Sequence, residues 1–118
     1  MEPLEYQGEQ IVVGQAGESY MGGPADAARL IEACFEHGAS RLLLYPENLS
    51  PQFFDLSSGD AGEVLQKLRN YRIRLAILRT PALRLSSRFG ELLADEAEGS
   101  YFRLFDGREE ALAWLAQT

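Results

Sequence analysis

The fold is decided by residues 24–45, which read PADAARLIEACFEHGASRLLLY. Within this stretch apolar side chains recur at the spacing of one helix face, and Pro24 suits the first helical turn, where an N–H has no partner. These apolar positions are Ala27, Leu30, Ile31, Cys34 and Phe35. His37-Gly38 marks the helix end, since glycine readily adopts the left-handed conformation that closes helices. Leu42-Leu43-Leu44-Tyr45 then forms a continuous apolar run, which is typical of a strand buried on both faces.

The residues before this helix indicate a hairpin and a loop. Residues 4–13 contain two short arms around Gly8-Glu9, where glycine at the first central position predicts a type II′ turn. Residues 14–23 contain four glycines and no apolar period, which predicts a loop. This loop lacks lysine and the glycine spacing of nucleotide-binding motifs, so we expect no phosphate cradle here.

Downstream of residue 45 the chain alternates between helical and strand periodicity. Helical spacing covers residues 61–68 and 89–97, strand patterns cover residues 73–78 and 101–105, and a last helix starts at Asp106 with Glu109 completing a capping box. Strands separated by helices need crossover connections, which makes the sheet mostly parallel. We therefore expect one α/β domain over residues 1–118, with a mixed, mostly parallel sheet, an N-terminal hairpin and about four helices.

Length and composition limit the classes of protein that this chain represents. The chain has 118 residues, of which 46% are apolar, and a formal net charge of −7, as suits one globular domain. The acidic balance disfavours nucleic acid and anionic membranes as partners. Residues 1–3 lack the basic and then apolar start of a signal peptide, and no apolar run approaches about 20 residues. We expect a cytoplasmic protein.

Few residues have the chemistry that catalysis or metal binding requires. His37 is the only histidine, and the helix end where it lies favours contacts with the last carbonyl groups. Cys34 falls on the apolar helix face, which is typical of a small core residue, and nothing near it supplies an orienting group. The acidic residues do not follow metal-ligand spacing. We expect no catalytic set, metal or cofactor, and a protein that is not an enzyme.

The segment between the buried strand and the second long helix has two interpretations. Ser57 and Ser58 lie at a helix amino terminus, where unpaired N–H groups and the helix dipole favour negative charge. In one interpretation a serine caps the helix, with Asp60 or Glu63 completing the cap. In the other, Ser58 or Ser57 is a phosphorylation site. Because Asp55 adds a third carboxylate, a bound free anion is disfavoured.

The second long helix and its surroundings form a candidate interaction surface. Its members are Asp55, Asp60, Glu63, Lys67, Asn70 and Arg72. Lys67, Arg69, Arg72 and Arg74 also make a local basic patch on an acidic protein. Such a patch is either a solvated helix face with cations near its carboxyl end or a docking surface for a protein partner or a second copy.

Several blocks of sequence resemble an uncharacterised bacterial family, the domain-of-unknown-function 4180 family. These blocks are Arg41-Leu42-Leu43-Leu44, Leu49-Ser50, Phe53-Phe54-Asp55-Leu56, Ala61-Gly62-Glu63, Leu65-Gln66-Lys67 and Asn70-Tyr71-Arg72. The likeness covers about residues 25–115.

More remotely, the order of elements and the run from Phe102 to Leu112 are similar to STAS domains of anti-anti-sigma factors. In those domains the serine before a glycine, in an Asp-Ser-Ser-Gly turn, is phosphorylated by a partner kinase. The resemblance places that role on Ser58, before Gly59, although Leu56 is inserted between Asp55 and Ser57.

Three functions are compatible with these observations. The first is a STAS-like regulatory domain that binds a protein and is switched at Ser58. The second is a small-molecule binder or enzyme that uses loops at the carboxyl ends of the parallel strands, where α/β sheets place ligands. Its pocket residues are Tyr45, Glu47, Asn48, Arg79, Thr80 and Asp106. The third is a homodimer whose activity is association.

Overall fold

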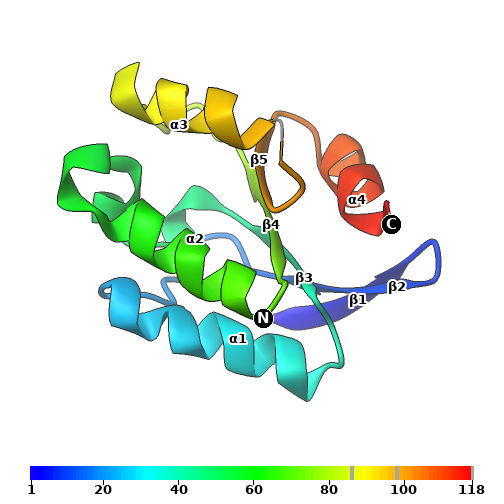
Figure 1. Cartoon of the computed structure of the whole chain (residues 1–118). Coiled ribbons are helices and arrows are strands. Elements are labelled where there is room, and N and C mark those ends of the chain that lie inside the picture. Colours follow the sequence, from blue (N-terminus) through cyan, green and yellow to red (C-terminus); the bar gives the residue numbers. More distant parts are fainter. Residues whose placement is uncertain (86, 98, 118) are drawn as a thin grey trace.

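The computed structural model describes residues 1–85, 87–97 and 99–117, which form one mixed sheet flanked by helices (Figure 1). The strands are β1 (Glu2–Tyr6), β2 (Glu9–Val13), β3 (Arg41–Leu44), β4 (Arg74–Leu78) and β5 (Phe102–Phe105). The α-helices are α1 (Ala27–Glu36), α2 (Asp60–Asn70), α3 (Ser87–Ala97) and α4 (Arg108–Ala116). Short 3₁₀ helices are η1 (Pro24–Asp26), η2 (Pro46–Asn48), η3 (Pro51–Phe54) and η4 (Leu56–Ser58).

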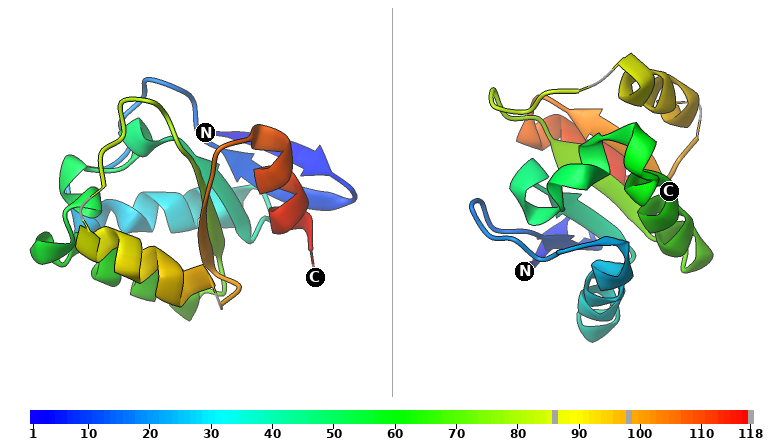
Figure 2. Two further views of the ribbon diagram at one scale, coloured as in Figure 1. Left: turned by 90° about the horizontal axis from the view of Figure 1, so that it is seen from above. Right: turned by 90° about the vertical axis from the view of Figure 1, so that its left-hand side faces the viewer.

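The strands lie side by side in chain order, from β1 to β5. β1 and β2 are antiparallel, and every later pair is parallel, which confirms the predicted sheet and hairpin. Crossovers between parallel strands are right-handed, so an order without reversal puts each connecting helix on the same face. Figures 1 and 2 show α1, α2 and α3 on this face and α4 on the other.

Two apolar cores form, one on each face of the sheet. Leu42, Leu43 and Leu44 of β3 are fully buried, which confirms that this strand is covered on both faces. Leu42 and Leu44 belong to the core beneath α1, α2 and α3, whereas Leu43 belongs to the core beneath α4. This division follows from the alternation of side chains along a strand. Trp114 of α4 is buried in the second core.

The N-terminal turn differs from the predicted one. Tyr6 pairs with Glu9, so the turn residues are Gln7 and Gly8 and not Gly8-Glu9. Both have positive φ, 50° and 83°, as a type I′ turn requires and a type II′ turn does not. The type I′ twist matches that of the flanking strands, so it fits a two-residue loop better.

Helices α1 and α2 end in the same way with different residues. In α1, Gly38 has a φ of 61°, and the N–H of Ala39 donates to the carbonyl of Cys34 (2.8 Å), as in a Schellman motif. In α2, Arg72 occupies the position of that glycine, with a φ of 56°. The N–H of Ile73 donates to the carbonyl of Leu68 (2.9 Å). Arg72 therefore adopts a left-handed conformation that disfavours side chains with a Cβ.

The start of the last helix also corrects the sequence prediction. Gly107, in an extended conformation, precedes α4, and no side chain accepts a capping hydrogen bond there. Asp106 turns instead toward Arg79, with a separation of 4.0 Å between carboxylate and guanidinium atoms. The expected capping box of Asp106 and Glu109 is therefore wrong, although the helix itself lies where the periodicity predicts it.

We expect Arg72→Gly to stabilise the protein. The left-handed conformation costs about 1–2 kcal/mol for a residue with a Cβ, and glycine loses part of that gain through its greater backbone freedom when unfolded. The free energy of unfolding, measured by urea denaturation, should rise by roughly 0.5–1 kcal/mol. Gly38→Ala, the reverse change at the end of α1, should lower it. A less stable Arg72→Gly variant would contradict this account of the helix end.

Candidate functional site

The serine turn, residues 55–60, contains η4 and leads into helix α2. The 3₁₀ helices η2 and η3 connect it to the buried strand β3. Its preceding residues Phe53 and Phe54 are buried in the core, where their rings contact Phe89, so the segment is anchored from one side. Asp55, Ser57 and Ser58 are exposed. The turn therefore combines a fixed backbone with accessible polar groups at a helix amino terminus.

Ser58 holds this turn together. Its Oγ lies within donating distance of the carbonyl oxygens of Gln52 (2.7 Å) and Asp55 (2.8 Å), and it accepts the N–H of Asp60 (3.1 Å). Ser57 has a smaller role, since its Oγ donates to a carboxylate oxygen of Asp55 (2.6 Å). Gly59 completes the turn with a φ of 80°. The serine therefore satisfies an N–H at the start of α2, and it does so from an exposed position.

The expected interaction surface is only partly continuous. Glu63, Lys67 and Asn70 lie on α2, where Glu63 and Lys67 form an ion pair of 3.5 Å one helical turn apart. Arg72 lies beyond the helix, in the left-handed conformation. The predicted basic patch of Lys67, Arg69, Arg72 and Arg74 is not continuous either, because Arg69 forms an ion pair with Glu96 of α3.

An exposed pair of aromatic side chains, which the sequence pattern did not predict, lies at the carboxyl ends of α1 and α2. Phe35 is 62% exposed and Tyr71 52% exposed, and their ring centres lie 5.5 Å apart at 78°. Placing Phe35 on the buried helix face was wrong. Although Ile31, one turn earlier on the same helix face, is buried, Phe35 lies in the last turn of α1 and contacts exposed Tyr71.

The six residues expected to form a ligand pocket are distributed among several sites. Glu47 and Thr80 line an apolar cavity of about 470 Å³ at the carboxyl ends of β3 and β4. Arg79 and Asp106 line a different hollow of about 290 Å³, and Tyr45 lines a further one on the α4 side of the sheet. The strand order has no reversal, so the sheet itself opens no crevice at this edge.

Asn48, the sixth residue, is fully buried and holds the glycine-rich loop in place. Its Nδ2 donates to the carbonyls of Gln15 (2.8 Å) and Glu18 (2.7 Å), and its Oδ1 accepts the N–H of Tyr45 (2.7 Å). A Cβ on Gly14 would collide with this Oδ1. Both the oxygen and the nitrogen of the amide are therefore hydrogen-bonded within the chain, and its role is to connect the glycine-rich loop to the end of β3.

Cys34 and His37 do not form a nucleophile and base in the structure. Cys34 is fully buried, and this burial raises the pKa of its thiol from 9.0 to about 12. His37 caps the carboxyl end of α1. Within residues 1–85, 87–97 and 99–117, no three His, Cys, Asp or Glu side chains are grouped as metal ligands. None of the helices in this part of the chain is long and apolar enough to cross a membrane.

We expect Ser58→Ala to destabilise the protein by about 1 kcal/mol, because it removes the acceptor of the Asp60 N–H and the donor to two carbonyls. Ser57→Ala should lower the free energy of unfolding by less than about 0.5 kcal/mol, since it removes one exposed hydrogen bond. Thermal or urea unfolding of the two variants measures the difference. Equal effects would show that Ser58 does not hold the turn.

The raised pKa of Cys34 predicts a native thiol that reacts slowly with thiol reagents near pH 8, and rapidly after unfolding in guanidinium. A raised pKa in the folded state stabilises the protein below the ordinary thiol pKa, and this contribution is lost as pH rises from about 9 toward about 12. Wild type should therefore lose more stability over this range than Cys34→Ala. Rapid labelling of the native thiol would contradict the burial of Cys34.

Comparison with known proteins identifies a family but no individual relative. None of the curated proteins and none of the solved structures compared with the chain is significantly similar to it. A family model described as a domain of unknown function (DUF4180) matches residues 6–115, from the end of β1 to the last turn of α4. The matched region contains the serine turn, the aromatic pair, helices α1, α2 and α3, and α4 except its last residue. The chain belongs to this DUF4180 family.

Proposed function

We propose that the chain is a non-enzymatic regulatory domain that binds another protein, and that phosphorylation of Ser58 switches this binding. The partner would bind the α1–α2 face, the surface of these two helices that carries Phe35 and Tyr71. The observation that carries the proposal is the exposed pair Phe35 and Tyr71. The likeness to STAS domains of anti-anti-sigma factors supports it. We place this activity in the bacterial cytoplasm, where a partner kinase would act on the serine.

The aromatic pair has the properties of an interface centre. Among the side chains that the structure describes, Phe35 and Tyr71 are the large apolar groups that are exposed. Aromatic residues supply much of the binding energy at protein interfaces, and tyrosine is enriched among the residues that matter most. The edge-to-face contact of the two rings limits their movement, so less conformational entropy is lost when a partner covers them.

The charges along the same face indicate the chemistry of the partner. Asp60 and Glu63 lie at the amino end of α2, about 16 Å and about 12 Å from Tyr71 by the rise of the helix, and Asp55 precedes them in the serine turn. A complementary surface has basic groups opposite these carboxylates and an apolar side chain against the two rings. A second copy of the chain fits less well, because the net charge of −7 opposes the approach of two acidic surfaces.

A phosphate on Ser58 would change both the charge and the hydrogen bonds of the serine turn. The hydroxyl now lies within donating distance of the carbonyls of Gln52 and Asp55, and phosphorylation replaces its proton with a negatively charged group. Repulsion from these carbonyls and from the nearby carboxylates would force the serine turn to rearrange. Phosphorylation therefore alters both the charge and the shape of the amino end of α2.

We expect a photo-crosslinking residue at position 35 or 71 to capture one protein in cells, whereas the same residue at exposed Arg88 of α3 should not. With that partner purified, Tyr71→Gln should weaken binding at least tenfold, because it removes a ring from the interface centre. Arg88→Gln should leave the affinity unchanged.

The serine switch has its own matched pair of variants. Ser58→Asp should change the affinity for the partner, whereas Ser57→Asp adds the same charge but keeps the Ser58 hydrogen bonds and should change it less. Mass spectrometry of the protein from cells should find phosphate on Ser58. Crosslinking only between copies of the chain, or affinity that is insensitive to Tyr71→Gln, would refute the interaction surface. Absence of phosphate together with an inert Ser58→Asp would refute the switch alone.

The cavity at the carboxyl ends of β3 and β4 favours a second candidate, a small-molecule binder. Its lining includes Leu49, Phe54 and Leu83 around Glu47 and Thr80, and its volume of about 470 Å³ suits a small apolar ligand. Such a ligand would shift the NMR resonances of Phe54 and Leu83. A protein on the α1–α2 face would instead shift those of Phe35 and Tyr71.

A further inference from the structure

Four arginine side chains gather around a cavity of about 440 Å³ at the amino ends of β3, β4 and β5, beside the carboxyl end of α4. They are Arg41, Arg72, Arg74 and Arg103. The described residues that line this arginine cavity include no aspartate or glutamate, although acidic residues outnumber lysine and arginine by 18 to 11 in the whole chain. The cavity is therefore a concentration of positive charge on an acidic protein.

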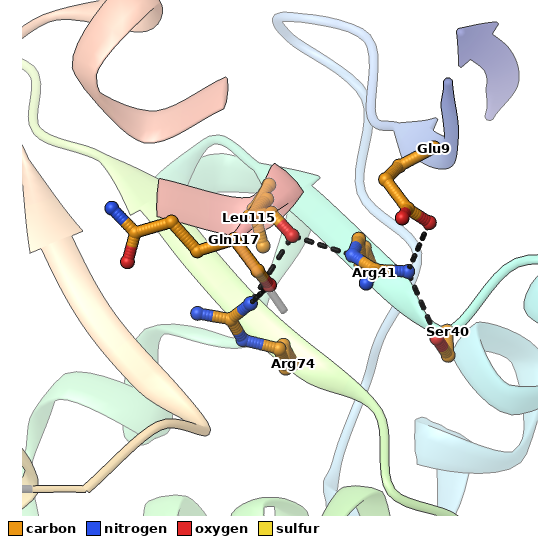
Figure 3. A network of polar contacts seen from close by, with 6 residues as sticks. All are labelled: Glu9, Ser40, Arg41, Arg74, Leu115 and Gln117. Atoms are coloured by element: carbon orange, nitrogen blue, oxygen red, sulfur yellow. Dashed lines mark hydrogen bonds and ion pairs between the residues drawn. The ribbon is translucent and has the colours of Figure 1, made fainter. Parts of the chain in front are cut away.

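Two of these arginines are fixed by backbone carbonyls at the end of α4 (Figure 3). Nη1 of Arg74 donates to the carbonyls of Leu115 (3.2 Å) and Gln117 (2.6 Å). Nε of Arg41 also donates to Leu115, and its Nη1 forms an ion pair with Glu9 (3.0 Å). Because the guanidinium group of Arg74 is already held in place, little side-chain entropy is lost when a ligand binds it.

The apolar wall of the cavity is Trp114, the only tryptophan of the chain. The guanidinium carbons of Arg74 and Arg103 lie 4.3 Å and 5.5 Å from its ring centre, which are cation–π distances. Burial lowers the pKa of Arg74, and the neighbouring charges of Arg41 and Arg103 lower it further. An anion in the cavity would relieve this repulsion.

Donors remain available toward the cavity. Within the described part of the chain, Nη2 of Arg74 and the guanidinium of Arg72 make no hydrogen bond. Arg72 also occupies the left-handed position where α1 has Gly38. A side chain kept in a conformation that favours glycine suggests a role for that side chain, and here it lines the cavity.

We propose that the arginine cavity binds a small phosphate or diphosphate anion, with Arg72 and Arg74 contacting the phosphate oxygens and Trp114 lying beside the ligand. Guanidinium groups match phosphate geometry with paired hydrogen bonds. The volume of about 440 Å³ suits a small molecule, and the net charge of −7 opposes long polyanions such as duplex DNA. The proposal does not depend on the α1–α2 face or on phosphorylation of Ser58.

The test uses the whole chain and inorganic pyrophosphate at constant ionic strength, with Trp114 fluorescence as a reporter inside the cavity. We expect a saturable change in fluorescence. Arg72→Gly should weaken binding at least fivefold while it stabilises the fold, so that loss of binding cannot come from unfolding. Arg72→Lys should give an intermediate affinity, because it keeps the charge but loses the paired hydrogen bonds.

Two control variants separate a specific site from general effects. Gln7→Gly replaces the other non-glycine residue with a positive φ and leaves the charge unchanged. Arg88→Gln removes one positive charge from an exposed position on α3. Neither variant should alter the affinity for pyrophosphate. Absence of a saturable signal, or equal weakening by Arg88→Gln and Arg72→Gly, would overturn the proposal. So would a phosphoserine peptide that binds more than tenfold tighter than pyrophosphate, because the cavity would then be a protein-docking site.

Discussion

The strand order constrains the rest of the molecule. Because the parallel strands are neighbours in chain order and their crossovers are right-handed, α1, α2 and α3 must share one face of the sheet. The other face would expose Ile11, Leu43 and Ala76 to water if α4 did not return across it. Docking of α4 in turn depends on Trp114 and on the arginines that bind its last carbonyls. One topological rule thus brings the aromatic pair to one face and sets the arginine cavity beside the end of the helix on the other.

Much of this fold could be predicted from periodicity alone. Leu42, Leu43 and Leu44 have no polar alternation, which indicates burial on both faces, and the structure confirms this. Helix and turn ends were less predictable, because they depend on single hydrogen bonds rather than on repeated burial. Gly38 ends α1 as expected, whereas Arg72 takes the same conformation at the end of α2, where its residue type gives no signal. The same limit explains why the hairpin turn was predicted at Gly8-Glu9, one residue beyond its position at Gln7 and Gly8.

A candidate site could be predicted where its residues are neighbours in the sequence. Ser58 and its neighbours lie next to one another in sequence, so the turn at the start of α2 could be recognised. Asn48 could not be assigned, because its partners in the loop at Gln15 and Glu18 are about 30 positions away. The arginine cavity draws Arg41, Arg74 and Arg103 from three strands, and only the register of the sheet brings them together. A site whose residues come from several strands can be identified only when the order and register of those strands are known.

The first strand has a consequence for the assembly of whole molecules. β1 lies at the edge of the sheet and contains Pro3, which has no N–H to offer, together with exposed Glu2 and Glu5. Strand-to-strand addition of a second sheet at this edge is disfavoured by a missing donor and by like charges. Growth into sheet-extended filaments through β1 is therefore disfavoured, which leaves β5 as the sheet edge without these two devices.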